Sequence, residues 1–308
     1  MPASGPRASA PAPTGLAEDG PADELASLNA GLDALDAPPA PSSWNGRSIL
    51  RSLVPPAAAI ALLILTWWIV VALKLQPQYL LPSPADVWTT FTGSLSSGEA
   101  ATAVGNSLLR AFVGFGISLV LGTILGLLLA RFTLVKSALG PIVTGLMVLP
   151  SVAWVPAAIL WFGISTEAML FVVVLGATPS IANGLVGGIG QIPPLLLRAG
   201  RVLGAEGLAA IRYIVLPAAL PGYLGGLRQG WAFAWRSLMA AELIAFSPAL
   251  GLGLGQLLDQ GRELSDMSLV MTTIIMILVV GIMVELCVFA PLERHVLRQR
   301  GLAPAGRS

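Results

Sequence analysis

The sequence predicts an all-α integral membrane protein with six transmembrane helices and short cytoplasmic helices between the fourth and the fifth. Three observations lead to this prediction. Hydrophobic residues make up 55% of the 308 residues and charged residues only 11%, whereas soluble proteins carry roughly 25% charged residues. Apolar runs of about 20 residues, long enough to cross a bilayer, recur along the chain. Basic residues gather in the loops on one side of these runs, which is typical of the cytoplasmic side.

The rest of the composition excludes several classes of function. A net charge of +1 argues against a nucleic-acid partner. The single histidine, His295, excludes haem or metal sites that need several histidines, and the single Cys287 cannot form an intrachain disulfide. Neither Lys74 nor Lys136 follows a glycine, so the chain lacks a phosphate-binding Gly-Lys loop. We therefore expect no catalytic residue, metal or cofactor, and expect any ATP to be hydrolysed by another chain.

The chain begins with a tail, residues 1–46, that is rich in Pro, Ala, Ser and Gly and carries several acids. Such a segment cannot bury enough apolar surface to order itself, so we predict a disordered cytoplasmic tail. After the first span, two prolines flank Ser83 and force an extended turn. Asp86 is placed to cap a short helix that begins at this turn.

The apolar runs define one membrane domain, residues 47–300, which is followed by a tail at 301–308. Pro150, Pro156 and Pro179 lie within the third and fourth spans, where each removes a backbone hydrogen bond and can kink its helix. Glycines spaced four residues apart are predicted to let neighbouring helices approach closely, at Gly122, Gly126, Gly184 and Gly188. The spans are expected at about residues 53–73, 107–130, 139–162, 168–189, 221–246 and 269–290.

The loop at residues 195–217 is the longest mixed polar segment inside the apolar body. Gly200, Gly204 and Gly207 would divide a long helix into short pieces, and Pro217 ends the loop before the fifth span. We predict two short helices that meet near Gly204 and present a surface to a partner; an ordinary interhelical loop is the alternative. The positive-inside rule places this loop and both termini in the cytoplasm.

The spacing of Gly204, Ile214 and Leu216-Pro217 resembles the signature loop of permease subunits of binding-protein-dependent ABC importers. In that family the loop reads Glu-Ala-Ala, three residues, Gly, nine residues, Ile-x-Leu-Pro. The chain departs from the triplet, because positions 198–200 read Arg-Ala-Gly. The salt bridge that the family's first glutamate would make therefore has no equivalent acid here.

The run that follows, from Leu216 to Glu242, is similar to the branch of the family that imports sulfonates, taurine and nitrate, and the whole resemblance extends from about Tyr79 to Arg298. It implies that the loop docks into a groove of an ATP-binding subunit and transmits its closure. Gly204 would permit the turn between the short helices, and its neighbours Leu203 and Ala205 would enter the groove. Arg201 and Glu206 would form ion pairs at the rim of the groove. The residues implied in coupling are Arg201, Leu203, Gly204, Ala205, Glu206, Ile214, Leu216 and Pro217.

Ionisable side chains within the spans are costly, so they mark either a function or a structural pair. At 100° per residue, the stripe of the fifth span that holds Arg228 also holds large aromatics and Glu242, while Arg236 lies about 80° away. One interpretation is an anion path in which guanidinium groups match oxyanions. The alternative is structural: Glu242 pairs with Arg236 or Arg110, and Glu285 pairs with a cytoplasmic-side arginine. The candidate path residues are Arg228, Trp235, Arg236, Glu242 and Arg110.

The resemblance implies a permease that moves a small oxyanion, most closely an aliphatic sulfonate, or else taurine, nitrate or a sulfate ester, across the bacterial plasma membrane. The partners it implies are ATP-binding cassette subunits, an external substrate-binding protein and a second permease copy, all at the lipid bilayer. A stand-alone secondary transporter or channel for a small anion is the alternative. Inverted repeats would mark such a transporter, and the sequence has no convincing internal repeat.

Overall fold

The computed structural model describes residues 46–245, 247 and 250–299, with side chains from residue 54 onward. The described residues from Val54 belong to one compact unit, Val54–Ala303, and within the described part all regular structure is helical. The predicted tails, residues 1–46 and 301–308, lie outside the described residues except for Gly46, which begins α2. The helices in order are α2 (Gly46–Ala72), α3 (Pro84–Ser96), α4 (Glu99–Arg131), α5 (Thr133–Val148), the 3-10 turn η1 (Ser151–Trp154), α6 (Val155–Phe162), α7 (Thr166–Gly190), α8 (Pro194–Val202), α9 (Gly207–Ala210), the π-helical turn η2 (Ile211–Val215), α10 (Leu216–Ile244), α11 (Leu254–Glu263), α12 (Met267–Val284), the π-helical turn η4 (Glu285–Phe289) and α13 (Ala290–Gln299).

The predicted all-helical membrane fold is confirmed. Five helical stretches of the described residues are long and apolar enough to cross a membrane, and a bent pair of shorter helices makes a sixth crossing if it counts as one span. The five stretches are Val54–Ala72, Glu99–Arg131, Thr166–Gly190, Gly207–Ile244 and Met267–Gln299. The bent pair is Thr133–Val148 with Ser151–Phe162.

The third predicted span differs from the expectation, because it is not one continuous helix. α5 ends at Val148, and the chain bends by 100° before the next helical segment. Pro150 explains the break: it has no N–H to donate, and it forces Leu149 out of the helical region, to a ψ of 123°. Pro156 lies in the first turn of α6, where proline is tolerated. Pro179 does not interrupt α7.

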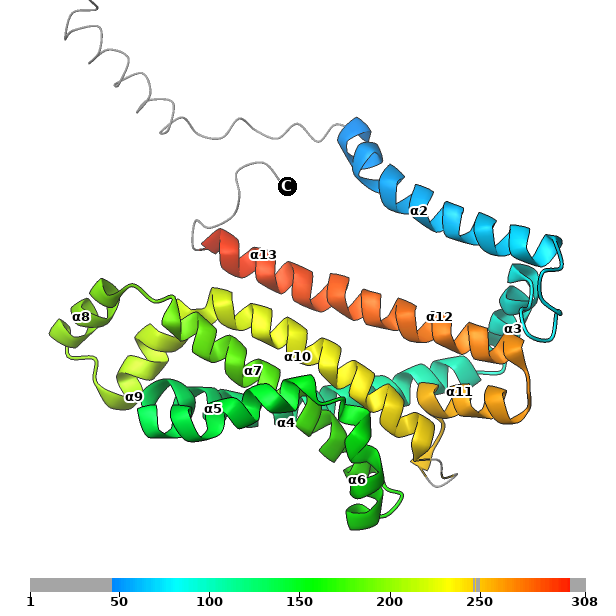
Figure 1. Ribbon diagram of the computed structural model, residues 1–308. Helices are drawn as coiled ribbons and strands as arrows, with labels where there is room; N and C mark the ends of the chain where they lie inside the picture. Colours follow the sequence, from blue (N-terminus) through cyan, green and yellow to red (C-terminus); the bar gives the residue numbers. More distant parts are fainter. Residues whose placement is uncertain (1–45, 246, 248–249, 300–308) are drawn as a thin grey trace, which may run out of the picture. The chain divides into compact units, whose positions relative to one another are not determined.

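Glycines hold the central helix α7 tightly between α4 and α10, as predicted. A Cβ at Gly184 would lie 2.3 Å from the Cα of Gly226, so the two backbones of α7 and α10 are in direct contact there. Against α4, a Cβ at Gly122 would lie 2.8 Å from the side chain of Ile181 of α7. Figure 1 shows α7 and α10 running alongside each other, with α8 and α9 at one end of the pair.

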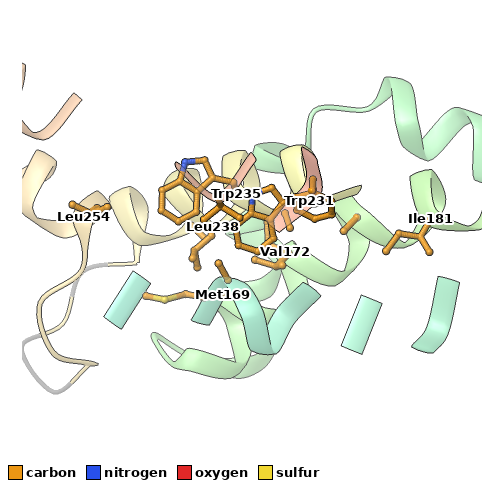
Figure 2. Packing of buried hydrophobic residues seen from close by; sticks show 14 of the residues in the cluster. Met169, Val172, Ile181, Trp231, Trp235, Leu238 and Leu254 are labelled. Atoms are coloured by element: carbon orange, nitrogen blue, oxygen red, sulfur yellow. The ribbon is translucent and has the colours of Figure 1, made fainter. Parts of the chain in front are cut away.

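The core lies around the middle of α7 and α10. Figure 2 shows Trp231 and Trp235 of α10 packed near Met169 and Val172 of α7. The two indole rings stack with their centroids 6.2 Å apart and their planes at 19°. α10 therefore packs in two ways. Large aromatic rings, Trp231 and Trp235, fill the core on one part of its surface, and glycines let its backbone touch α7 on another.

The short helix α3 begins at the predicted turn, with Ser83 rather than Asp86 as its N-cap. The Ser83 hydroxyl accepts a hydrogen bond from the Asp86 N–H at 3.2 Å, and the Asp86 carboxylate accepts from the Ser83 N–H at 3.0 Å. This is a reciprocal capping box. The hydrogen bonds from the Ser83 hydroxyl and backbone N–H lower the pKa of Asp86 below its usual value. α3 is tied to α12 through the Thr272 hydroxyl, which donates to the Val87 carbonyl.

Candidate functional site

The loop between α7 and α10 contains the two short helices that the sequence predicts, α8 and α9. Gly204 lies between them with a φ of +81°, in the left-handed region that favours glycine. Its N–H donates to the Arg201 carbonyl, and the Ala205 N–H donates to the Gly200 carbonyl, both at 3.0 Å. These bonds end α8 and reverse the chain, so Gly204 sets the angle between the two helices.

The candidate coupling residues divide into an exposed set and a packed set. Leu203 is 86% exposed, and Arg201, Glu206 and Pro217 are exposed as well. None of the ion pairs within the described residues involves Arg201 or Glu206. The packed set, Ala205, Ile214 and Leu216, is partly buried against the rest of the chain. The loop therefore presents a charged and apolar surface on a packed base.

The glycine of the Arg-Ala-Gly triplet has a local structural explanation. A Cβ at Gly200 would lie 2.0 Å from the Cδ1 atom of Ile214, so α8 packs against η2 more closely than an alanine would allow without a shift of that side chain. Gly200 thus allows a close contact between α8 and η2, and no contact in the structure explains Arg198 at the first position of the triplet.

At the far end of α10, Arg110 and Glu242 form a buried ion pair. The Arg110 Nη1 atom donates to Glu242 Oε1 at 2.7 Å, and their side chains are 8% and 0% exposed. The Ser107 hydroxyl donates to Glu242 Oε2 at 2.7 Å, and the Gly255 N–H donates to the same oxygen at 3.0 Å. A buried carboxylate with these three donors is fully compensated, as the structural alternative for Glu242 requires.

A second ion pair involves Arg228 and acids of the last helical segment. The Arg228 Nε atom contacts the Glu285 carboxylate, and its Nη1 atom lies 3.4 Å from Glu293 Oε2. The Arg228 side chain is 52% exposed. The structure thus joins Glu285 to an arginine, as the structural alternative predicts, and leaves this pair on the surface of the chain.

Arg236 differs from both of these arginines. It is exposed, its Nε atom donates to the Ala232 carbonyl of its own helix at 3.0 Å, and its guanidinium lies over the Phe233 ring at 4.9 Å. Within the described residues its two terminal nitrogens have no partner. Gln229 is exposed two turns away, and 100° per residue puts it within about 20° of Arg236 on α10.

Trp235 does not share this exposed face. It is 7% exposed and its indole lies against α12, where a Cβ at Gly281 would come within 3.3 Å of its Nε1 atom. The face of α10 that was predicted to face protein or water therefore packs mostly against protein, because Trp231 and Glu242 are buried as well. Among the candidate path residues, only Arg228 and Arg236 have exposed side chains.

A cavity of about 300 Å³ lies beside Arg110. Its polar lining comes from Asn106, Arg110 and Thr166, and the rest is apolar. Both terminal nitrogens of Arg110 already bind Glu242 and the carbonyls of Leu250 and Gly251. The cavity therefore offers an anion little free positive charge.

Three features of this region were missed by sequence reasoning. Ser107 and Asn106, which bind the segment before α11, are ordinary polar residues of a long helix and give no local signal. Gln229 carries no charge and so did not stand out. The alternating glycines at Gly251, Gly253 and Gly255 are visible in the sequence, and each is now seen to allow a close approach or an unusual backbone angle.

Comparisons with known proteins agree with this architecture. Residues 118–297 match the family described as the binding-protein-dependent transport system inner membrane component. SsuC of Bacillus subtilis, named as an aliphatic sulfonates transport permease, is 31% identical over 82% of this chain and 88% of its own length. The taurine transport permease TauC of Escherichia coli is 27% identical over 77% of this chain and 86% of its own length. The riboflavin transport permease RibX of Chloroflexus aurantiacus is 33% identical over 68% and 77%, respectively.

Among solved structures, a chain of the MetNI methionine ABC transporter in an inward-facing conformation has the same fold. It superposes with a TM-score of 0.53 at 22% sequence identity, and the match covers 64% of this chain and 96% of that chain. The matched family region begins within α4 and includes the whole of α5 to α12, so it contains both ends of α10 described above. The chain belongs to the family of binding-protein-dependent transport inner membrane components, and it is a multi-pass permease subunit of an ABC importer.

Proposed function

We propose that this permease imports a small oxyanion, most closely an aliphatic sulfonate, with ATP hydrolysed on separate ATP-binding subunits. Taurine, nitrate and sulfate esters are the neighbouring substrates. Two relatives named for sulfonates or taurine cover more than three quarters of the chain. The observation that carries the proposal is Arg236, an exposed arginine within a membrane-crossing helix whose terminal nitrogens have no partner among the described residues.

An exposed guanidinium within a membrane is costly unless water or another polar group meets it. Arg236 is oriented by its own Nε bond to Ala232 and by the Phe233 ring, so its two terminal nitrogens stay available in a fixed fork. Such a fork matches two oxygens of a sulfonate. Arg228 lies on the edge of the same exposed region but is already neutralised by Glu285 and Glu293. We therefore assign Arg236 to the substrate path.

The assembly follows from the loop between α7 and α10. We propose that its exposed residues, among them Arg201, Leu203 and Glu206, dock into an ATP-binding subunit on the cytoplasmic side, with both termini on that side. One chain offers one such loop, so a pair of permeases would serve a pair of ATP-binding subunits. An external substrate-binding protein would deliver the sulfonate to the other side. Its specificity would decide among closely related anions.

Transport by the reconstituted complex tests the proposal. The permease is placed in liposomes with its ATP-binding subunits and binding protein, and uptake of ethanesulfonate, taurine, nitrate and riboflavin is measured with and without ATP. We expect ATP-dependent uptake of the sulfonates. Uptake by the permease alone would support the secondary transporter or channel instead, and uptake of riboflavin without the sulfonates would refute the substrate assignment.

A further inference from the structure

The segment that leads into α11, together with the first two residues of that helix, is held by side chains along its whole length. From Leu250 to Gly255, every residue has one backbone group bound by a side chain, and we call these six residues the pinned segment. The first three residues accept through their carbonyls: Leu250 and Gly251 from Arg110, and Leu252 from Asn106. The last three donate through their N–H groups: Gly253 to Gln256, Leu254 to Ser107, and Gly255 to Glu242.

Glu242 is the centre of this network. It is completely buried, and its two carboxylate oxygens together accept hydrogen bonds from Arg110, Ser107 and the Gly255 N–H. The Ser107 hydroxyl that donates to Glu242 also accepts the Leu254 N–H at 2.8 Å. The carboxylate therefore binds the first turn of α11 directly and through Ser107, and it also orients the arginine that holds the two preceding carbonyls.

The glycines of the pinned segment bring its backbone against Glu242. A Cβ at Gly253 would lie 2.7 Å from the Glu242 carboxylate, and a Cβ at Gly255 would lie 2.5 Å from the Glu242 Cβ. Gly251 has a φ of +74°, which favours glycine at that turn. Backbone atoms and a buried carboxylate thus meet without any intervening flexible side chain.

Glu242 lies on the last turn of α10. α10 begins at Leu216, at the end of the loop at residues 195–217, which we call the coupling loop after its proposed role. α10 is itself fixed to α7 by backbone contacts at Gly184 with Gly226 and at Gly188 with Gly222. α7 enters the coupling loop and α10 leaves it, so the loop is carried by a fixed pair of helices (Figure 1). One continuous helix, packed closely on α7, thus joins the coupling loop to Glu242.

We propose that Glu242 is a positioning residue that makes the pinned segment and α11 move together with α10. Arg110, Ser107 and Asn106 complete this joint from α4. Displacement of the coupling loop by the ATP-binding subunit would thereby shift α11, and contact of another protein with α11 would be felt at the loop, since such coupling is reciprocal. This inference rests on the proposed function, because it assumes the two partners at opposite ends of α10.

Hydrogen exchange on the purified full-length chain tests the joint without any partner. In Glu242→Gln a neutral amide replaces the buried carboxylate, and we expect the Leu254 and Gly255 amides to exchange about tenfold faster, since bonds to charged groups are stronger than neutral ones. The amides of α7 should keep their exchange rates. Glu263→Gln is the matched control, because Glu263 is an exposed acid of the same α11.

Nucleotide hydrolysis by the assembled complex tests the coupling. The ratio of hydrolysis rates with and without ethanesulfonate-loaded binding protein should fall toward one in Glu242→Gln, while the basal rate stays within about twofold of the wild type. Ser107→Ala provides a milder second variant if Glu242→Gln fails to fold. It removes one hydroxyl from the joint and should reduce the same ratio by a smaller factor.

Each outcome decides the inference. Faster exchange with a reduced ratio supports it. Unchanged exchange at Leu254 and Gly255 would overturn the joint, and faster exchange with an unchanged ratio would overturn the coupling. A wild-type complex that shows no hydrolysis at all would refute the proposed function and with it the coupling, and the exchange result on the chain alone separates this case from failure of the joint.

Discussion

The two ends of α10 differ in how their charged side chains are placed. At its start, the coupling loop keeps Arg201, Leu203 and Glu206 exposed, with no ion pair for either charge among the described residues. At its end, Arg110 and Glu242 are buried and every residue of the pinned segment is bound by a side chain. One end leaves its charged groups exposed and outside the ion pairs of the described residues, while the other uses them within the chain.

The same contrast separates two of the three arginines that the sequence analysis placed in a candidate anion path, Arg110 and Arg236. Arg110 has its terminal nitrogens occupied by a carboxylate and two carbonyls. Arg236 has an anchored Nε and terminal nitrogens without partners in the described part of the chain. An arginine in a membrane helix is therefore informative only once its partners are known. Substitutions at these two positions should have different consequences.

The largest effect is expected for the stability of Arg110→Ala. The substitution leaves the Glu242 carboxylate buried without its charge partner, which costs about 3–5 kcal/mol of the free energy of unfolding. A lower thermal midpoint in detergent measures the loss. Arg236→Ala is the control and should leave the midpoint almost unchanged. A double substitution of Arg110 and Glu242 by leucine should be less damaging than Arg110→Ala, and equal midpoints for Arg110→Ala and Arg236→Ala would contradict the contrast.

Arg236→Ala should instead act on transport. Loss of a charge-assisted pair with the sulfonate costs about 1.5–3 kcal/mol, so uptake at low substrate concentration should fall at least about tenfold. The measurement is the initial rate of ethanesulfonate uptake by the reconstituted complex, normalised to the amount of inserted permease. Arg228→Ala is the comparison variant, since Arg228 is paired with Glu285 and Glu293. Unchanged uptake in Arg236→Ala would remove it from the path.

Gly204→Trp tests the exposed end of α10. A bulky residue at a φ of +81° strains the turn by about 1–2 kcal/mol and enlarges the docking surface. We expect weaker co-purification of the ATP-binding subunit and more ATP hydrolysed per substrate molecule transported, with little change in insertion. Leu264→Trp places the same bulk on an exposed position just after α11 and serves as control. Normal coupling in Gly204→Trp would argue against docking at this turn.

The smallest effect is expected at α3 and depends on pH. Because the pKa of Asp86 is lowered by the Ser83 hydrogen bonds, its carboxylate stabilises the capped turn above its usual pKa of 3.8, and this contribution is lost as the pH falls through the lowered value. Asp86→Asn should therefore speed amide exchange in the first turn of α3 at pH 7. The difference from the wild type should shrink as the pH falls below 3.8 and through the lowered pKa, and a difference that did not shrink would show another cause.

Sequence reasoning reached the features that depend on local chemistry. Composition and apolar runs predict the membrane helices, Gly204 predicts the turn between α8 and α9, and the small residues near Gly184 predict the close helix contact. The break at Pro150 was visible as a possible kink, but the 100° bend depends on how η1 packs, with the Ser151 hydroxyl bonded to that of Ser237 in α10. Proline marks where a helix can stop, and tertiary contacts decide whether it does.

The joint around Glu242 could not be predicted in the same way. Glu242 and Arg110 are separated by 132 residues, and Ser107 is 135 residues away. Nothing in the local pattern selects Arg110 over Arg236 as the partner of Glu242, and both pairings were open. The choice is made by the packing of α4 against α7 and α10, which brings the N-terminal half of α4 to the end of α10. Long-range pairing of this kind needs the fold.

Gly184 with Gly226 and Gly188 with Gly222 form a glycine seam between α7 and α10. This seam limits which sequence changes the permease can accept. Where two main chains touch, no side chain lies between the helices, so a change of rotamer at these glycines cannot let one helix move past the other. Adaptation to new solutes is then confined to the outer flanks of these helices, where Arg236 and Gln229 can be replaced without disturbing the seam.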